Sequence, residues 1–127
     1  MKPNKIVYEN QKEIHDFIIN KLKSSCLKYV KEAYLIGSLA DGKFGKYKEE
    51  YEGQLGSDID VVAIPMKIKS NWKYQGDFYN WHKKYDVEKI KIKNIQHSIS
   101  FMLPFNENIN LFWKIAKQLN WKVEKLK

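Results

Sequence analysis

The sequence predicts a single α+β domain over residues 1–127, in which helices flank a small mixed β-sheet. Two apolar runs of strand length, at 33–36 and 59–64, indicate buried strands, because a strand covered on both faces reads as a continuous hydrophobic segment. Two longer segments, 8–22 and 107–126, repeat apolar residues at helical spacing. The resulting order of helices and strands is typical of an α+β domain. A chain of 127 residues also has the usual size of one folding unit.

The first half of the chain is predicted to contain one helix, one strand and a long loop. In residues 8–22 apolar side chains recur every three or four positions and charged ones fill the remainder. The run at 33–36 is followed at once by Gly37 and Ser38, which is typical of a buried strand that enters a tight turn. Residues 41–57 carry glycines, lysines and glutamates without an apolar period. We therefore expect a loop there, and long loops inside compact domains are usually functional.

The second half is predicted to alternate strands with two helices. Residues 59–64 form the strongest strand pattern in the chain, and a proline follows them. Three of the six aromatic rings in 71–85 lie three and four residues apart, which predicts a helix. Alternation of polar and apolar residues predicts strands at 89–93 and 95–103. Apolar residues on one face of 107–126 predict a closing helix.

The composition points to a polyanionic partner or to a generally lysine-rich chain. Twenty-three basic residues give a formal net charge of +8, which favours RNA, DNA or a nucleoside triphosphate as a partner. The lysines are scattered, so a compositional bias explains the charge equally well. The single cysteine, Cys26, excludes an internal disulfide and agrees with a cytoplasmic location. No apolar run approaches the ~20 residues of a membrane helix.

The residues with the clearest chemistry are Asp58 and Asp60, at the start of the strand 59–64. Side chains alternate along a strand, so both carboxylates are expected on one face. Two anions so placed repel each other unless a cation lies between them, and oxygen ligands suit Mg²⁺ or Mn²⁺. Gly37 and Ser38 are expected to approach a phosphate through their backbone and hydroxyl groups. If the two strands are neighbours, these two groups meet at one end of the sheet.

This arrangement resembles the signature of the DNA polymerase β-like nucleotidyltransferase superfamily. The matching features are an apolar strand, Gly37-Ser38, and then Ser57-Asp58-Ile59-Asp60 at the head of the next strand. The chain is most similar to the minimal nucleotidyltransferase (MNT) domains, some of which act as antitoxins beside HEPN toxins. The resemblance implies a nucleotidyltransferase fold and a nucleotide-binding site at Gly37, Ser38 and Ser57. It also implies catalytic, metal-binding roles for Asp58 and Asp60.

The same resemblance implies a third carboxylate on a later strand. The expected strand at 95–103 offers only Gln96, Ser98 and Ser100 at its non-apolar positions, and none is acidic. His97 shares the alternation of the apolar residues, so we expect it to pack in the core. The sequence therefore predicts a metal–triphosphate site more firmly than it predicts turnover.

Two functions remain open at this stage. The first is an enzyme that transfers NMP from an NTP such as ATP, with Mg²⁺ or Mn²⁺, to a hydroxyl of nucleic acid, protein or a small molecule. The second is a catalytically weak or inactive binding module, such as the antitoxin or regulatory subunit of a HEPN/MNT-type complex. The rings of 71–85 suit core packing or base stacking. Lys43, Lys46 and Lys48 either reach phosphate or pair with nearby glutamates.

Overall fold

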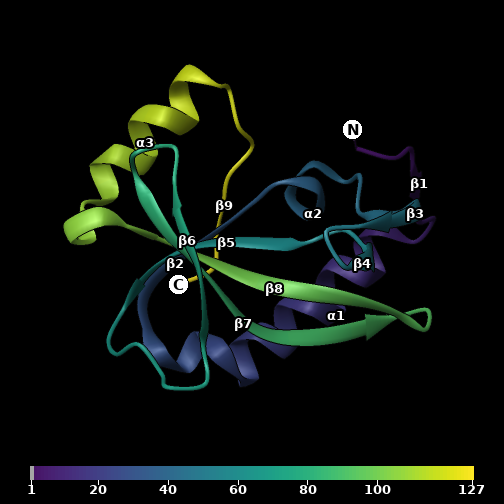
Figure 1. Cartoon of the computed structure of the whole chain (residues 1–127), viewed down its shortest axis with the longest axis horizontal. Coiled ribbons are helices and arrows are strands. Elements are labelled where there is room, and N and C mark those ends of the chain that lie inside the picture. Colours follow the sequence, from purple (N-terminus) through teal and green to yellow (C-terminus); the bar gives the residue numbers. More distant parts are fainter. Residues whose placement is uncertain (1) are drawn as a thin grey trace.

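The computed structural model describes residues 2–127 and is predominantly β (Figure 1). Strands account for 44% of the chain and helices for 28%. The strands are β1 (Lys5–Val7), β2 (Val30–Ile36), β3 (Gly45–Tyr51), β4 (Gln54–Gly56), β5 (Ile59–Pro65), β6 (Lys73–Phe78), β7 (His82–Ile92), β8 (Ile95–Pro104) and β9 (Glu124–Lys125). The helices are α1 (Gln11–Ser24), α2 (Ser38–Asp41), α3 (Ile109–Gln118) and the 3₁₀ turns Cys26–Tyr29 and Phe105–Glu107.

The strands form two sheets. The larger sheet has six strands in the order β6-β7-β8-β5-β2-β9, and the smaller has three in the order β1-β3-β4. Only β5 and β8 pair in parallel within the described residues, with Asp60 opposite Ser100; the other pairs in both sheets are antiparallel. The prediction of an α+β nucleotidyltransferase fold around one small mixed sheet is therefore wrong, because much of the chain expected as helix or loop is strand.

The larger sheet separates two apolar clusters. Ile59, Val61 and Ala63 of β5 belong to the cluster that α1 covers, whereas Val62 belongs to the cluster beneath α3. This split follows from the alternation of side chains along a strand. Asp60 shares the side of Val62, so the candidate carboxylates lie on the α3 face of the sheet. Figure 1 shows α1 and α3 on different sides of the strands.

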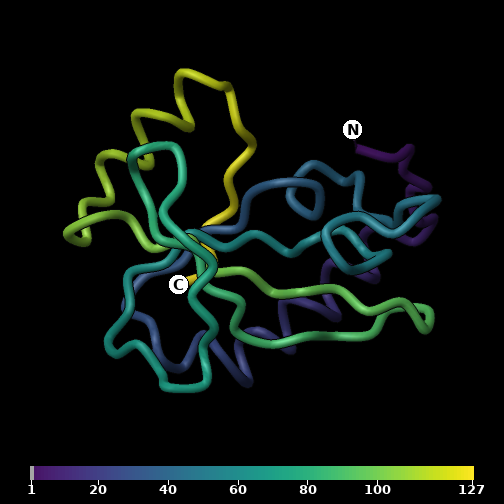
Figure 2. Tube along the Cα trace, viewed as in Figure 1, coloured from purple at the N-terminus to yellow at the C-terminus, as the bar shows by residue number. Residues whose placement is uncertain are grey.

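The smaller sheet replaces most of the loop expected at 41–57. β3 pairs with β1 near the N-terminus, with Ile6 opposite Lys46, and β4 folds back on β3. Figure 2 shows this N-terminal segment beside the chain of β3 and β4. The sequence has no local apolar period that would indicate this sheet, because β1 pairs with β3 residues about 40 positions later in the chain. Long-range pairing of short polar strands is a tertiary effect that local patterns do not reveal.

The expected helix at 71–85 is also wrong. The segment is the hairpin β6–β7, which reverses at Tyr79 and Asn80, both with positive φ values of 52° and 61°. Two residues in the left-handed region are the mark of a tight hairpin turn, which asparagine tolerates well. The rings at spacings of three and four lie on both sides of this turn, so their apparent helical period is coincidental.

The closing helix is shorter than predicted, and the remaining expected elements are present. α3 ends at Gln118, Asn120 takes a positive φ of 55°, and the tail then pairs as β9 with β2. α1, β2, β5 and β8 each overlap the segment in which that helix or strand was expected. No helix in residues 2–127 is long and apolar enough to cross a membrane.

Candidate functional site

Gly37 and Asp60 lie side by side because β2 and β5 are neighbours. In the antiparallel register Ile36 is opposite Asp60, so Gly37 follows β2 at the level of that carboxylate. Gly37 has φ 79° and ψ −158°, a conformation that essentially only glycine adopts. A Cβ atom at Gly37 would lie 2.9 Å from Asp60 Oδ2. The turn is thus packed against the carboxylate, and glycine meets both the dihedral and the steric requirement.

Asp58 precedes β5 and is held by side chains from two other strands. Gln54 Nε2 of β4 donates to Asp58 Oδ1 at 2.7 Å, and Lys84 Nζ of β7 lies 3.6 Å from Asp58 Oδ2. Gln54 is oriented in turn by Ser98, whose hydroxyl donates to Gln54 Oε1 at 2.6 Å. Burial raises the pKa of Asp58, and the charge of Asp86 adds to this, while Lys84 opposes it.

The pKa of Asp60 is raised to about 6, first by burial and then by the negative charge of Asp58. Burial disfavours the ionised form of a carboxyl, and a second anion nearby disfavours it further. Lys84, Lys2 and Lys5 lower the pKa without cancelling these effects. The two carboxylates therefore repel each other in the free protein. A bound cation would relieve that repulsion.

Ser57 supports the segment that leads into Asp58. Its hydroxyl donates to Gly45 O at 2.9 Å, and its carbonyl lies 2.7 Å from His97 Nδ1. A carbonyl only accepts, so Nδ1 carries the proton and Nε2 accepts from the Tyr8 hydroxyl at 3.0 Å. Burial lowers the pKa of His97, which keeps the ring neutral. His97 is fully buried, which confirms its expected place in the core.

A cavity of about 430 Å³ opens over the two aspartates and is called here the lysine cavity. Its basic residues are Lys2 and Lys5 from the N-terminal segment and Lys43 from the chain before β3. All the residues expected from the sequence to bind metal or nucleotide line it: Gly37, Ser38, Ser57, Asp58 and Asp60. Of the two serines, Ser57 already uses its hydroxyl in a hydrogen bond to the Gly45 carbonyl.

Asp86 brings a third carboxylate to the same face of the sheet. Asp60 is opposite Ser100 on β8, and Ser100 is opposite Asp86 on β7, so the three form one row across three strands. Ser100 Oγ donates to Asp86 Oδ1 at 3.2 Å. Two strand spacings of ~4.8 Å separate the backbones of the aspartates. The sequence gives no signal for this position, because the hairpin that creates the register was not recognisable.

Asp86 lines a second cavity of about 360 Å³, called here the polar cavity. It shares Asp58 with the lysine cavity and adds Lys84, Gln54 and Ser98. The lysine cavity reaches towards β2 and the polar cavity covers β7 and β8. Asp58 and Asp60, on the chain of β5, therefore lie between a hollow lined by three lysines and four carboxylates, their own included, and a second polar hollow.

The donor set fits a divalent cation that takes part of its coordination from a ligand. Within residues 2–127 no three acidic, histidine or cysteine side chains are grouped closely enough to hold a metal by themselves. Asp58 and Asp60 supply two carboxylates, and the missing side chain of Gly37 avoids a clash with Asp60 Oδ2. Mg²⁺ commonly binds one or two carboxylates and completes its shell with water and phosphate oxygens.

Comparison with known proteins adds no family to this geometry. No protein-family model, curated protein or solved structure matches the chain. The functional argument therefore depends on the site itself: its paired carboxylates, its glycine turn and the basic residues around them.

Proposed function

We propose that this chain is a metal-dependent nucleotidyltransferase that transfers NMP from an NTP such as ATP to a hydroxyl acceptor. The observation that carries the proposal is the packing of the Gly37 turn against Asp60, beside Asp58 and beneath three lysines. A phosphate chain requires positive charge, close backbone approach and a cation held by carboxylates. Those requirements meet in one cavity, although its residues come from four separate parts of the chain.

The lysine cavity suits the outer phosphates of the nucleotide. Lys5 Nζ is close enough to Asp41 and Asp60 for their charges to raise its pKa, while burial and Lys2 lower it. Lys5 therefore lies near the carboxylates, in a cavity that Lys2 and Lys43 also line together with Asp41, Glu52, Asp58 and Asp60. A triphosphate in this cavity would neutralise the lysines, and its α-phosphate would lie towards β5.

The polar cavity suits the acceptor. In-line transfer needs the attacking hydroxyl and the leaving pyrophosphate on opposite sides of the α-phosphorus. The hydroxyl oxygen forms a bond to the α-phosphorus, the bond from that phosphorus to the bridging oxygen breaks, and pyrophosphate leaves. Of the carboxylates that line the polar cavity, Asp58, Asp86 and Glu52, we assign Asp86 to take the proton of the attacking hydroxyl, because Ser100 orients it.

Mg²⁺ or Mn²⁺ held by Asp58 and Asp60 would supply positive charge to the phosphates as charge develops in the transition state. The protein side of the site performs the remaining tasks. Gln54 and Lys84 hold the Asp58 carboxylate in place, and the close contact of Gly37 fixes Asp60. Preorganisation of this kind is a large part of catalysis by enzymes of phosphoryl transfer.

Only general chemistry indicates which kind of molecule carries the attacking hydroxyl. The formal net charge of +8 favours a nucleic acid hydroxyl, and a protein or small-molecule hydroxyl would enter the polar cavity equally well. A partner subunit of HEPN type would add acceptor surface to that of the polar cavity. The single cysteine suits a cytoplasmic setting for either arrangement.

One observation favours a second function, that of a binding module without efficient turnover. Asp86 is separated from Asp60 by the whole of β8, and it does not group with Asp58 and Asp60 as a metal ligand. A chain that binds Mg²⁺–ATP tightly but transfers no nucleotide would serve as the antitoxin or regulatory subunit of a complex.

The test uses ATP labelled at the α-phosphate, incubated with the purified chain, Mg²⁺, and an RNA oligonucleotide, a protein mixture or water as acceptor. Transfer is measured as label joined to the acceptor together with pyrophosphate release. We expect Asp58→Asn/Asp60→Asn to abolish both ATP binding and transfer. Asp86→Asn should lower transfer by about 100-fold or more while leaving ATP binding intact, because it removes only the proton acceptor.

The matched control is Asp16→Asn, which changes an exposed carboxyl on α1, on the opposite face of the larger sheet. It should bind and transfer like the wild type. Equal transfer by the Asp58/Asp60 double variant would refute the proposed site. Tight ATP binding without transfer to any acceptor would instead support the binding module.

A further inference from the structure

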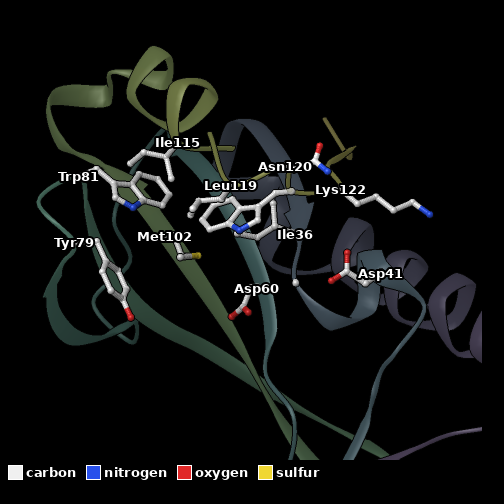
Figure 3. A pocket seen from close by; sticks show the side chains of 12 residues that line it. Ile36, Asp41, Asp60, Tyr79, Trp81, Met102, Ile115, Leu119, Asn120 and Lys122 are labelled. Carbon is white, nitrogen blue, oxygen red and sulfur yellow. The ribbon is translucent and has the colours of Figure 1, made fainter. Parts of the chain in front are cut away.

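We propose that the cavity beneath α3 receives the base and ribose of the nucleotide, which makes the ligand a complete nucleoside triphosphate and not a bare polyphosphate. This inference rests on the proposed function, because it places the rest of the molecule whose phosphates occupy the lysine cavity. The cavity measures about 700 Å³ and is called here the aromatic cavity. Figure 3 shows Tyr79 and Trp81 at one side of it and Asn120 and Lys122 at the other.

The first argument is continuity with the phosphate site. Gly37, Asp41 and Asp60 line both the aromatic cavity and the lysine cavity. A ligand whose phosphate lies at Asp60 therefore has a direct path into the aromatic cavity. Figure 3 shows Asp60 between Met102 and Asp41, at the edge of the hollow. The two cavities together form one bent channel around the Gly37 turn.

The second argument is chemical complementarity. Trp81 and Trp121 line the aromatic cavity with ring centroids 6.5 Å apart; Trp81 is only 2% exposed, so Trp121 is the ring that a base can reach, and Ile36, Met102 and Ile115 complete the apolar wall. Base–aromatic stacking stabilises nucleotides without regard to sequence, because every base has a π-face. A volume of 300–1,000 Å³ is usual for cofactor-sized ligands. Phosphate has no affinity for such a wall, whereas a base and ribose gain from it.

The acceptor hydroxyl does not enter the aromatic cavity, because no free proton acceptor lies there. The attacking hydroxyl needs a proton acceptor, and the carboxylates around the aromatic cavity are Asp41 and Asp60. Asp60 is assigned to the cation, and Asp41 lies beyond the Gly37 turn, at the mouth of the lysine cavity. Asp86 lines the polar cavity and not the aromatic one. The acceptor and the base therefore take different hollows on either side of the α-phosphate.

The side chains at the mouth of the aromatic cavity are exposed and are not part of the packed core. Tyr79 is 83% exposed at the β6–β7 turn, and Leu119 is 60% exposed after α3. Exposed apolar side chains at the rim of a hollow commonly mark a ligand site. Because neither is packed in the core, both can be replaced without unfolding the protein. These two positions make the inference testable.

The experiment compares Mg²⁺–ATP, Mg²⁺–CTP and Mg²⁺–tripolyphosphate by calorimetry and by quenching of tryptophan fluorescence. We expect both nucleotides to bind at least about fivefold more tightly than tripolyphosphate, the factor that stacking of one base provides. Only the nucleotides should quench fluorescence, since only they bring a base to Trp121. Tyr79→Ala/Leu119→Ser should lower nucleotide affinity towards that of tripolyphosphate and leave tripolyphosphate binding unchanged.

The control is Met66→Ser, which removes a side chain that is 56% exposed just after β5, away from the three cavities. It should change none of the affinities. Equal affinity for ATP and tripolyphosphate, or full ATP affinity in the double variant, would overturn the base site. Such a result would leave the proposed function standing as long as tripolyphosphate binding still needs Mg²⁺ and Asp60. Failure of all three ligands to bind would instead remove the proposed function itself.

Discussion

Replacement of Gly37 by alanine separates the role of this turn in the site from its role in the fold. The conformation at φ 79° and ψ −158° costs a residue with a side chain about 1–3 kcal/mol. The new Cβ would also lie 2.9 Å from Asp60 Oδ2, so the carboxylate must turn away. We expect the melting temperature to fall by roughly 5–12 °C, from a shift of several degrees per kcal/mol.

The effect on the ligand should be larger than the effect on stability. Displacement of Asp60 weakens the cation site, and loss of correct orientation at a metal ligand typically costs about 10–100-fold in affinity. Calorimetry with Mg²⁺–ATP measures this directly, at a temperature where the variant remains folded. Circular dichroism on the same samples supplies the melting temperature.

Gly42→Ala is the matched control. Gly42 also has a positive φ of 73°, but no atom lies within 4 Å of the position where its Cβ would be. The substitution should cost about 1–2 kcal/mol through the backbone alone and leave ATP affinity unchanged. If Gly37→Ala binds Mg²⁺–ATP as tightly as Gly42→Ala does, the packing of Gly37 against Asp60 has no part in ligand binding and the reasoning fails.

Three further changes test the packing of the fold. Burial lowers the pKa of His82 to about 4, so the folded state prefers the neutral ring; its contribution is complete above pH 6.5, and between pH 7 and pH 5 the wild type should lose about 2 kcal/mol more stability to urea unfolding than His82→Phe does. Ile18→Ala should cost about 2–5 kcal/mol because the side chain is fully buried, whereas the 56% exposed Phe17 should tolerate alanine within about 0.5 kcal/mol in the same titration. Ser57→Ala removes the hydroxyl that donates to the Gly45 carbonyl, which keeps its hydrogen bond from the Ser57 backbone N–H; the free energy of unfolding should fall by about 0.5–1.5 kcal/mol, and no change in the urea midpoint would contradict that.

The two strands that carry the expected site could be predicted from the sequence because both are continuous apolar runs. β2 and β5 are buried on both faces, so their composition alone indicates them. Their pairing then follows from the tendency of successive strands to be neighbours. The place of Gly37 beside Asp60 depends on nothing more than these two facts and the register.

The rest of the site depends on contacts between distant segments. Lys5 reaches the lysine cavity because β1 pairs with β3, about 40 residues later, and Lys84 and Asp86 reach the polar cavity because β7 pairs with β8. The turn at Tyr79 and Asn80 lacks the glycine that usually announces such a hairpin. The aromatic residues on either side of the turn also imitate a helical period. The aromatic content of this segment was interpreted correctly as core packing, but the helical period assigned to it was wrong.

Asp58 and Asp60 belong to different parts of the architecture, although one residue separates them in the chain. Asp60 is fixed within the larger sheet opposite Ile36, whereas Asp58 is bonded to Gln54 of the smaller sheet. A cation that draws the two carboxylates together therefore fastens one sheet to the other. Binding of a cation would then slow amide hydrogen exchange along β3 and β4. Exchange in the smaller sheet would therefore measure occupancy of the site.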